Sequence, residues 1–170
     1  EMQRSLVGSE MCIRDRLHID TNQAFSQADI TRVVVHHDSR YTFYISSPEL
    51  MPLDNVKALK EAQHLFPYPC EFLFETTSNH FREEDVIEYS DYIMHHVLGN
   101  VPEMQSMTRD DMDLKDNILT LHTVNHIQCD SIKTQLNEMR TLLSGFGINI
   151  DLRAEIDADN HEYQQTIAKM

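Results

Sequence analysis

The first half of the chain alternates apolar and polar residues in a way that predicts paired strands. Residues 30–37 (ITRVVVHH) are rich in β-branched side chains, and residues 41–47 (YTFYISS) alternate apolar and polar positions. The intervening DSR supplies turn residues, so the two segments predict a β-hairpin. On the first strand, Val33 and Val35 are expected on one face, and Ile30 and Val34 on the other.

A helix and a third strand are expected to follow the hairpin. Apolar residues recur at near-helical spacing, and Pro67 and Pro69 prevent a long continuation, so we expect a helix over residues 53–65. Residues 70–77 (CEFLFETT) alternate phenylalanine with glutamate, which is typical of a strand. Residues 17–29, before the hairpin, have weak periodicity and are expected to hold one short helix or a loop.

A second helix is expected over residues 82–99 (REEDVIEYSDYIMHHVLG). Ser78 and Asn79 are its candidate N-caps, acidic residues fill its first turn, where the helix dipole favours them, and Gly99 ends it. Residues 100–117 are expected to be a polar connector with some helical potential. The apolar side of the helix is expected to contain Val86, Ser90, Ile93 and Val97, beside Ile87, Met94 and Leu98.

The last third of the chain has the clearest pattern. Residues 117–124 (NILTLHTV) predict a strand, and Asn125 or His126 is expected to cap an amphipathic helix that ends at GFG, residues 145–147. Residues 148–157 (INIDLRAEID) alternate without interruption, so one face is expected to be buried and the other to meet water. The buried face is expected to hold Ile148, Ile150, Leu152, Ala154 and Ile156.

The expected order of elements is therefore β-β-α-β-α, a connector, and then β-α-β. Strands packed against helices on one face give small two-layer sheet-and-helix modules, so the expected fold class is α+β. The pattern leaves open whether the strands join one sheet or two.

Composition and charge narrow the functional classes. The chain has 170 residues and three widely separated cysteines, Cys12, Cys70 and Cys129, which argue against a disulfide framework and for a reducing, cytoplasmic setting. No apolar stretch is long enough to cross a bilayer. The net charge of −14 repels phosphate backbones and suits a module that meets a protein partner or belongs to a larger chain. Acidity that simply maintains solubility is an equally good interpretation.

Two histidine pairs are the first candidate metal ligands. His36 and His37 precede Asp38, but neighbours on a strand point to opposite faces, so these imidazoles do not easily share one ion. His95 and His96 diverge around a helix axis in the same way. We therefore expect a strand end and a helix surface rather than metal sites.

Two further groups have metal-like spacing. His122, His126 and Cys129 match a zinc half-site, but no second ligand pair is evident, so we expect a strand residue, a cap and a semi-buried thiol. Asp111 and Asp113 have the spacing that metal-dependent phosphoryl transfer often uses, but the glycine and glutamate of a calcium loop are absent. An acidic surface connector is the simpler interpretation.

Other signatures of catalysis or phosphate binding are missing from the sequence. The four glycines do not form a phosphate-binding loop, and Gly145 and Gly147 are better explained as a helix C-cap. No serine lies in a nucleophile-elbow motif, and no basic stripe is interleaved with aromatic residues. The residues themselves therefore predict no catalytic, cofactor-binding or metal site.

Three segments together resemble the N-terminal region, domains I and II, of PolC-type DNA polymerase III. They are residues 30–66, residues 74–98 and residues 117–157, and the most telling parts are the FG of GFG and the acidic end AEID. This family is the replicative DNA polymerase of low-GC Gram-positive bacteria, and the resemblance covers about residues 20–165. It rests on element order and scattered residues rather than on a diagnostic motif.

The resemblance implies a parent enzyme that is a DNA-directed DNA polymerase (a nucleotidyltransferase), uses magnesium and carries a 3′–5′ proofreading exonuclease. The catalytic carboxylates of the family lie downstream of this region, so Asp111 and Asp113 are not assigned to them. N-terminal segments of this kind are implied to be small α+β modules that contact replisome proteins, with a clamp-loader subunit as one candidate. DNA would be contacted through domains outside this chain, and no membrane role is implied.

The resemblance also gives the first residues a context. SLVGSEMCIRDR, residues 5–16, differs from the family and matches a translated transposase-type sequencing-library adapter. We expect residues 1–16 to be a non-native, disordered tail, residues 17–77 an incomplete domain I, residues 78–157 domain II, and residues 158–170 the start of a linker. Because the first native elements are then missing, the fragment is expected to be marginally stable.

The expected function is thus a non-catalytic N-terminal fragment of a replicative polymerase that serves as a protein-interaction module. One alternative is a KH-like module that binds single-stranded nucleic acid, although GFG is not the GXXG loop that such folds use on RNA. A second alternative is a small-ligand regulatory domain, which requires a pocket between sheet and helices.

Overall fold

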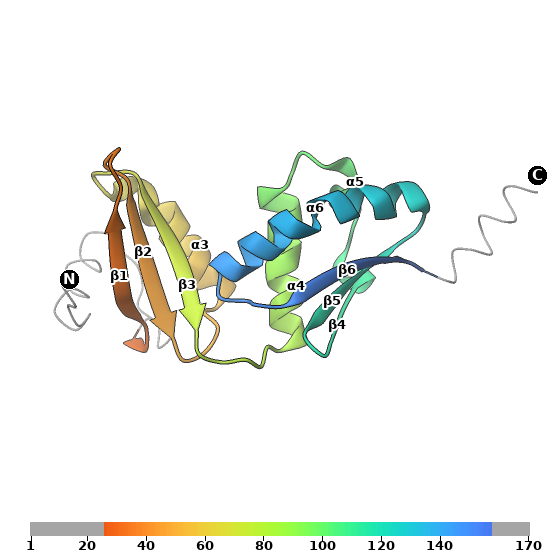
Figure 1. Ribbon diagram of the computed structural model, residues 1–170, viewed down its shortest axis with the longest axis horizontal. Coiled ribbons are helices and arrows are strands. Elements are labelled where there is room, and N and C mark those ends of the chain that lie inside the picture. Colours follow the sequence, from red (N-terminus) through yellow and green to blue (C-terminus); the bar gives the residue numbers. More distant parts are fainter. Residues whose placement is uncertain (1–25, 158–170) are drawn as a thin grey trace, which may run out of the picture. The chain divides into compact units, whose positions relative to one another are not determined.

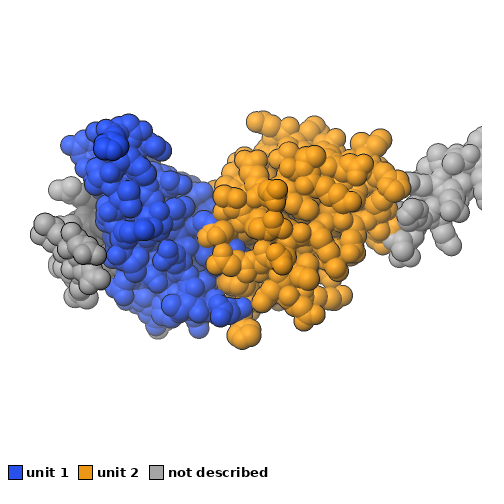
Figure 2. All heavy atoms as spheres, in the orientation of Figure 1, with its two compact units in different colours: residues 1–79, 145–148 blue, residues 80–144, 149–170 orange. Residues whose placement is uncertain are grey.

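The computed structural model describes residues 26–157, which form two compact units (Figure 2). The first unit contains the chain up to residue 79 together with residues 145–148, and the second contains residues 80–144 and those from 149 onward. The chain therefore passes from one unit to the other three times. The expected adapter tail, the first part of the expected element at 17–29, and the expected linker at 158–170 lie outside the described residues.

The first unit is built on a three-stranded sheet in the order β1-β2-β3 (Figure 1). Strand β1 (Asp29–Val35) is antiparallel to β2 (Tyr41–Ser47), and β2 is parallel to β3 (Cys70–Thr76). Helix α3 (Leu53–Ala62) and the 3₁₀ turn η1 (Gln63–Leu65) connect the two parallel strands. The expected hairpin, helix and third strand are confirmed.

An irregularity in β1 changes the expected face of one residue. The register pairs Ile30 with Ile45 and Val33 with Phe43, so three steps along β1 oppose two along β2. Such a bulge moves the residues before it to the opposite face. Ile30 therefore shares a face with Val33 and Val35, and the prediction that grouped it with Val34 is wrong.

The core of the first unit lies between one sheet face and α3. Ile45 of β2 and Phe74 of β3 are register partners, and both are buried. Val56 and Leu59 of α3 are also buried. Phe146, Ile148 and the intervening Gly147 complete this unit from the second passage of the chain.

Gly147 has φ +91°, and a Cβ there would lie 3.3 Å from the Phe74 carbonyl oxygen. Both features favour glycine. The expected capping role of the two glycines is thus divided: Gly145 is the last residue of the helix, and Gly147 makes the left-handed turn after it.

The second unit has a separate three-stranded sheet in the order β4-β5-β6. Strand β4 (Met112–Lys115) is antiparallel to β5 (Ile118–Thr123), and β5 is parallel to β6 (Asp151–Ile156) through helix α6 (His126–Gly145). The two sheets therefore have the same topology, a hairpin followed by a helix and a parallel strand. The described strands form two sheets, which resolves the point that the pattern left open.

Strand β4 corrects the prediction for residues 100–117. That segment contains helix α5 (Pro102–Gln105), a 3₁₀ turn (Arg109–Asp111) and β4, rather than a plain connector. Asp116 and Asn117 both have positive φ, 51° and 59°, and join β4 to β5 in a two-residue turn. Asx residues tolerate this conformation, and paired left-handed residues are the basis of type I′ hairpins.

Helix α4 (Glu83–Tyr92) starts later than its expected caps, because Arg82 is the N-cap residue and no side chain caps the helix. The prediction of Ser78 or Asn79 is therefore wrong, while the acidic first turn is confirmed. A π-helical turn (Ile93–Val97) follows. Because this turn contains an extra residue, Val97 leaves the apolar stripe and is exposed, unlike Ile93 and Met94.

Other expected features of the last third of the chain agree with the structure. The Asn125 side chain accepts a hydrogen bond from the Gln128 backbone N–H at 2.8 Å, which makes Asn125 rather than His126 the N-cap of α6. Ile148, Ile150, Leu152 and Ala154 are all buried, as the alternation predicted. Among residues 26–157, no helix combines the length and apolarity needed to span a membrane.

Candidate interaction surface

Five aromatic side chains gather on the helix-side face of the first sheet, where β2 and β3 begin. Tyr41 contacts Phe66 and Tyr68, with ring centroids 5.9 and 5.4 Å apart. Phe43 contacts Phe66 and Phe72 at 5.4 and 5.5 Å. We refer to these five residues as the aromatic cluster. Aromatic pairs at these separations stabilise one another beyond their buried area, so the cluster is a rigid platform.

Part of this cluster faces solvent. Tyr68 is 50% exposed, and Leu65, which directly precedes Phe66, is 52% exposed. Both residues belong to the connection between α3 and β3, at the β3 side of the sheet. The other four rings of the cluster are partly buried. Large apolar and aromatic side chains that remain partly exposed beside such neighbours are typical of protein–protein interfaces. The alternation at residues 41–47 and 70–77 placed Tyr41, Phe43 and Phe72 on predicted strands, whereas Phe66 and Tyr68 lie in the proline-containing loop between η1 and β3.

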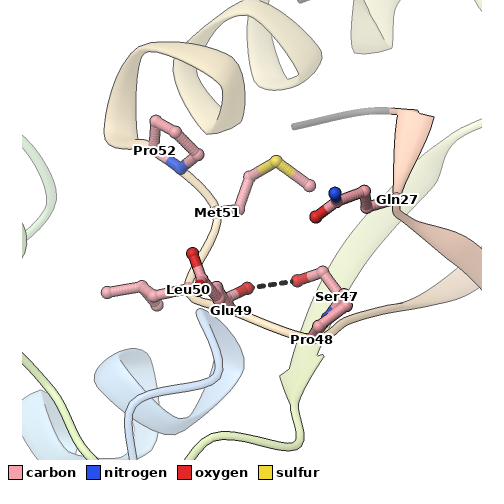
Figure 3. A pocket seen from close by; sticks show the side chains of 7 residues that line it. All are labelled: Gln27, Ser47, Pro48, Glu49, Leu50, Met51 and Pro52. Atoms are coloured by element: carbon pink, nitrogen blue, oxygen red, sulfur yellow. Dashed lines mark hydrogen bonds between the residues drawn. The ribbon is translucent and has the colours of Figure 1, made fainter. Parts of the chain in front are cut away.

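A pocket of about 380 Å³ lies beside the connection between β2 and α3 (Figure 3). Its lining consists of Gln27, Ser47, Pro48, Glu49, Leu50, Met51 and Pro52. The Ser47 hydroxyl already donates to the Glu49 carbonyl oxygen at 2.6 Å, and Glu49 is the only charged residue in the lining. This chemistry offers few convergent polar groups to orient a small ligand.

The structure places the histidine pairs in local contacts. His36 Nε2 lies 2.8 Å from the Thr42 hydroxyl. His95 Nδ1 lies 3.1 Å from Asp91 Oδ1, and the His96 ring stacks on Tyr92. The turn after His37 is held by Asp38, which accepts a hydrogen bond from Arg40 at 2.6 Å, and this bond lowers the pKa of the Asp38 carboxyl.

The three residues with zinc-like spacing do not share one site in the structure. His122 Nε2 donates to Asp113 Oδ1 at 2.8 Å across the β4–β5 pair, whereas Cys129 is buried in α6. Cys70 and Cys129 are free thiols, and burial raises the pKa of the Cys70 thiol. Within residues 26–157, no three histidine, cysteine or acidic side chains gather as metal ligands would.

The two aspartates of the DDMD segment also have separate roles. Asp111 Oδ2 accepts hydrogen bonds from the backbone N–H and the hydroxyl of Thr108, at 2.8 and 2.9 Å, and so closes a capping box. Asp113 is paired with His122 and, at 3.1 Å, with Lys115. Neither carboxylate is oriented toward a shared ion. The sequence pattern does not reveal the His122–Asp113 pair, because the pair depends on the register of β4 against β5.

Hydrogen bonds from His122 and Lys115 lower the pKa of Asp113, and this makes a testable prediction. A carboxyl with a lowered pKa stabilises the fold above its ordinary pKa of 3.8, and this contribution is lost as the pH falls through the lowered value. Because the bond from His122 is the larger cause, His122→Phe should raise the Asp113 pKa more than Lys115→Ala does, as measured by an NMR titration. His126→Phe is the control and should leave the Asp113 curve unchanged; an equal shift in that control would contradict the assignment.

Comparison with known proteins identifies one family. Residues 13–64 match the family described as DNA polymerase III polC-type N-terminus I. Searches among curated proteins and solved structures return no match. The resemblance to the N-terminal region of PolC-type DNA polymerase III is therefore confirmed over this part of the chain, whose described portion holds β1, β2 and α3. The match starts at residue 13, within four residues of the expected adapter boundary, and the adapter origin of residues 1–16 stays a prediction.

Proposed function

We propose that this chain is a non-catalytic N-terminal part of a PolC-type DNA polymerase III and that it contacts another protein of the replisome. The family match over residues 13–64 carries this proposal. DNA polymerisation with magnesium and 3′–5′ proofreading would belong to the parent enzyme. That enzyme would act in the cytoplasm. DNA would be contacted by other domains of that enzyme.

The aromatic cluster supports a protein partner. Tyr68 and Leu65 offer exposed apolar area, and the Tyr68 ring lies 5.4 Å from the Tyr41 ring of β2. A rigid anchor of this kind loses little side-chain entropy on binding, which is why aromatic residues are enriched in interface centres. The net charge of −14 further favours a protein partner with basic surface over a phosphate backbone.

A binding assay with purified replisome proteins from a low-GC Gram-positive bacterium tests this proposal. The first protein to test is a clamp-loader subunit. We expect one of them to bind the immobilised chain, and Tyr68→Ala and Leu65→Ala each to weaken this binding about tenfold. Ile127→Ala is the matched control, because Ile127 is a 76% exposed apolar residue outside the cluster. Equal weakening by all three variants, or by none, would contradict the assigned surface.

Two outcomes would contradict the proposed function itself. Tight binding to single-stranded DNA that weakens steeply with salt would instead identify a KH-like nucleic-acid-binding module. Extension or cleavage of DNA by the purified chain, with contaminating enzymes excluded, would show a reactive centre in this part of the protein.

A further inference from the structure

Residues 145–148 (GFGI) belong to the first unit, although the residues on both sides of them belong to the second (Figure 2). We call these four residues the strap. Helix α6 leads into the strap, and Asn149, which follows it, comes two residues before β6 begins. The Ser144 hydroxyl donates a hydrogen bond to Asn149 Oδ1 at 2.9 Å, which joins the residue before the strap to the residue after it. The second unit therefore fixes both ends of the strap.

The strap lies along β3, which is an edge strand of the first sheet. A Cβ atom at Gly145 would lie 3.5 Å from the Leu73 side chain. A Cβ atom at Gly147 would lie 3.4 Å from the backbone nitrogen of Thr76. Such close approach leaves no room for a side chain at Gly147 unless the backbone of β3 shifts. The strap therefore follows β3 at backbone distance.

Two apolar side chains of the strap are part of the core of the first unit. Phe146 and Ile148 are only 4% and 1% exposed, and the Lys60 ammonium of α3 lies 4.6 Å from the Phe146 ring centroid. Gly147, between them, has φ +91°, a conformation that other residues rarely adopt. The first unit therefore binds the strap in one specific conformation and loses buried apolar contacts when the strap leaves.

We propose that the strap couples the folding of the two units, so that they unfold together. Its buried side chains stabilise the first unit, while α6 and β6 of the second unit hold its two ends. When the second unit unfolds, these ends are released, and conformational entropy opposes the return of the strap to the first unit. By linkage, a partner that stabilises one unit also stabilises the other. This inference concerns the stability of the chain and does not depend on the proposed function.

The test is urea unfolding of the full 170-residue chain, followed by NMR. Amide signals of β2 report on the first unit and those of β5 on the second, and we expect both to disappear with the same midpoint. Ile132, in α6, is fully buried in the second unit. Ile132→Ala should therefore lower both midpoints by about 1–2 M urea. In a chain that also carries Phe146→Ala, Ile132→Ala should lower the β5 midpoint alone.

A second strap variant keeps the test decisive if Phe146→Ala leaves the first unit unfolded. Gly147→Ala retains both apolar side chains but strains the left-handed turn, so it should also confine the effect of Ile132→Ala to β5. Gly99→Ala is the matched control, because a Cβ atom at Gly99 would make only an ordinary contact, 3.7 Å from the His95 carbonyl oxygen.

Two results would overturn the proposal. If Ile132→Ala lowers only the β5 midpoint while the strap is unaltered, the units unfold independently. If it still lowers the β2 midpoint in both strap variants, as it should with Gly99→Ala, the units are coupled by a route other than the strap.

Discussion

Replacement of Phe146 by alanine is expected to destabilise the first unit by about 3–5 kcal/mol. The ring is only 4% exposed, although Phe146 reaches this unit 70 residues after β3 ends. The Lys60 ammonium lies 4.6 Å from the ring centroid, so the substitution removes a cation–π contact as well as buried apolar area. Hydrogen exchange of the β2 and β3 amides, followed by mass spectrometry, measures the loss of stability within the first unit.

Leu65→Ala is the control for this prediction, because Leu65 belongs to the same unit but is about half exposed. Exposed substitutions usually change stability by no more than about 0.5 kcal/mol. If Phe146→Ala lowers the stability of the first unit no more than the control does, residues 145–148 are dispensable to that unit. A loss confined to β4–β6 would show that they support the other sheet instead.

Replacement of Tyr89 by alanine is expected to destabilise the second unit by about 3–5 kcal/mol, since Tyr89 is almost fully buried in α4 beside the first turn of that helix. The expected signature is loss of protection in β4 and β5. Tyr92→Ala provides the matched control on the same helix, because Tyr92 is only partly buried. A smaller effect at Tyr89 than at Tyr92 would contradict the burial on which this prediction rests.

The same residue gives a pH dependence. Burial, with the nearby charges of Glu88 and Asp85, raises the pKa of Tyr89 above its ordinary value of 10.0. A raised pKa means that its contribution to stability is complete below about pH 10 and is lost as the pH rises above that value. Tyr89→Phe should therefore remove part of the alkaline loss of stability in urea unfolding curves, whereas Tyr92→Phe should retain all of it.

The local pattern of apolar and polar residues was sufficient to predict an element where the segment is regular and one of its faces is buried. The strand at 41–47 has the bounds that its alternation predicted, and Ile148 to Ala154 are buried at every second position as expected. In both cases the period of two directly reflects which side meets the core. Helix 53–65 was also recognised, although its last turn tightens to a 3₁₀ turn before Pro67.

Features that depend on partners elsewhere in the chain could not be predicted in this way. Strand β4 has only four residues, MDLK, and too little β-branched content to be recognised alone. The Asp116–Asn117 dipeptide before a clear strand was a usable turn signal, and it would have revealed both β4 and the His122–Asp113 pair. The bulge in β1 left no comparable signal.

The aromatic cluster illustrates the same limit for the proposed interaction surface. Tyr41, Phe43 and Phe72 come from strands that the pattern identified, but their contacts depend on parallel pairing of β2 with β3. Phe66 and Tyr68 join them from the loop between η1 and β3; the near-helical spacing had grouped Phe66 with the apolar residues of the helix instead. The net charge suits either a protein partner or solubility alone, and the surface that we propose for a partner depends on the pairing of β2 with β3.

The passage of residues 145–148 through the first unit has a consequence for synthesis on the ribosome. The sheet of that unit is complete at Thr76, yet Phe146 and Ile148 are about 70 residues away and emerge roughly 4–14 s later at bacterial elongation rates. During that interval the nascent sheet lacks two of its buried side chains and displays the apolar surface that they later cover. Chaperone occupancy and pause sites are therefore expected to matter most between residues 77 and 148.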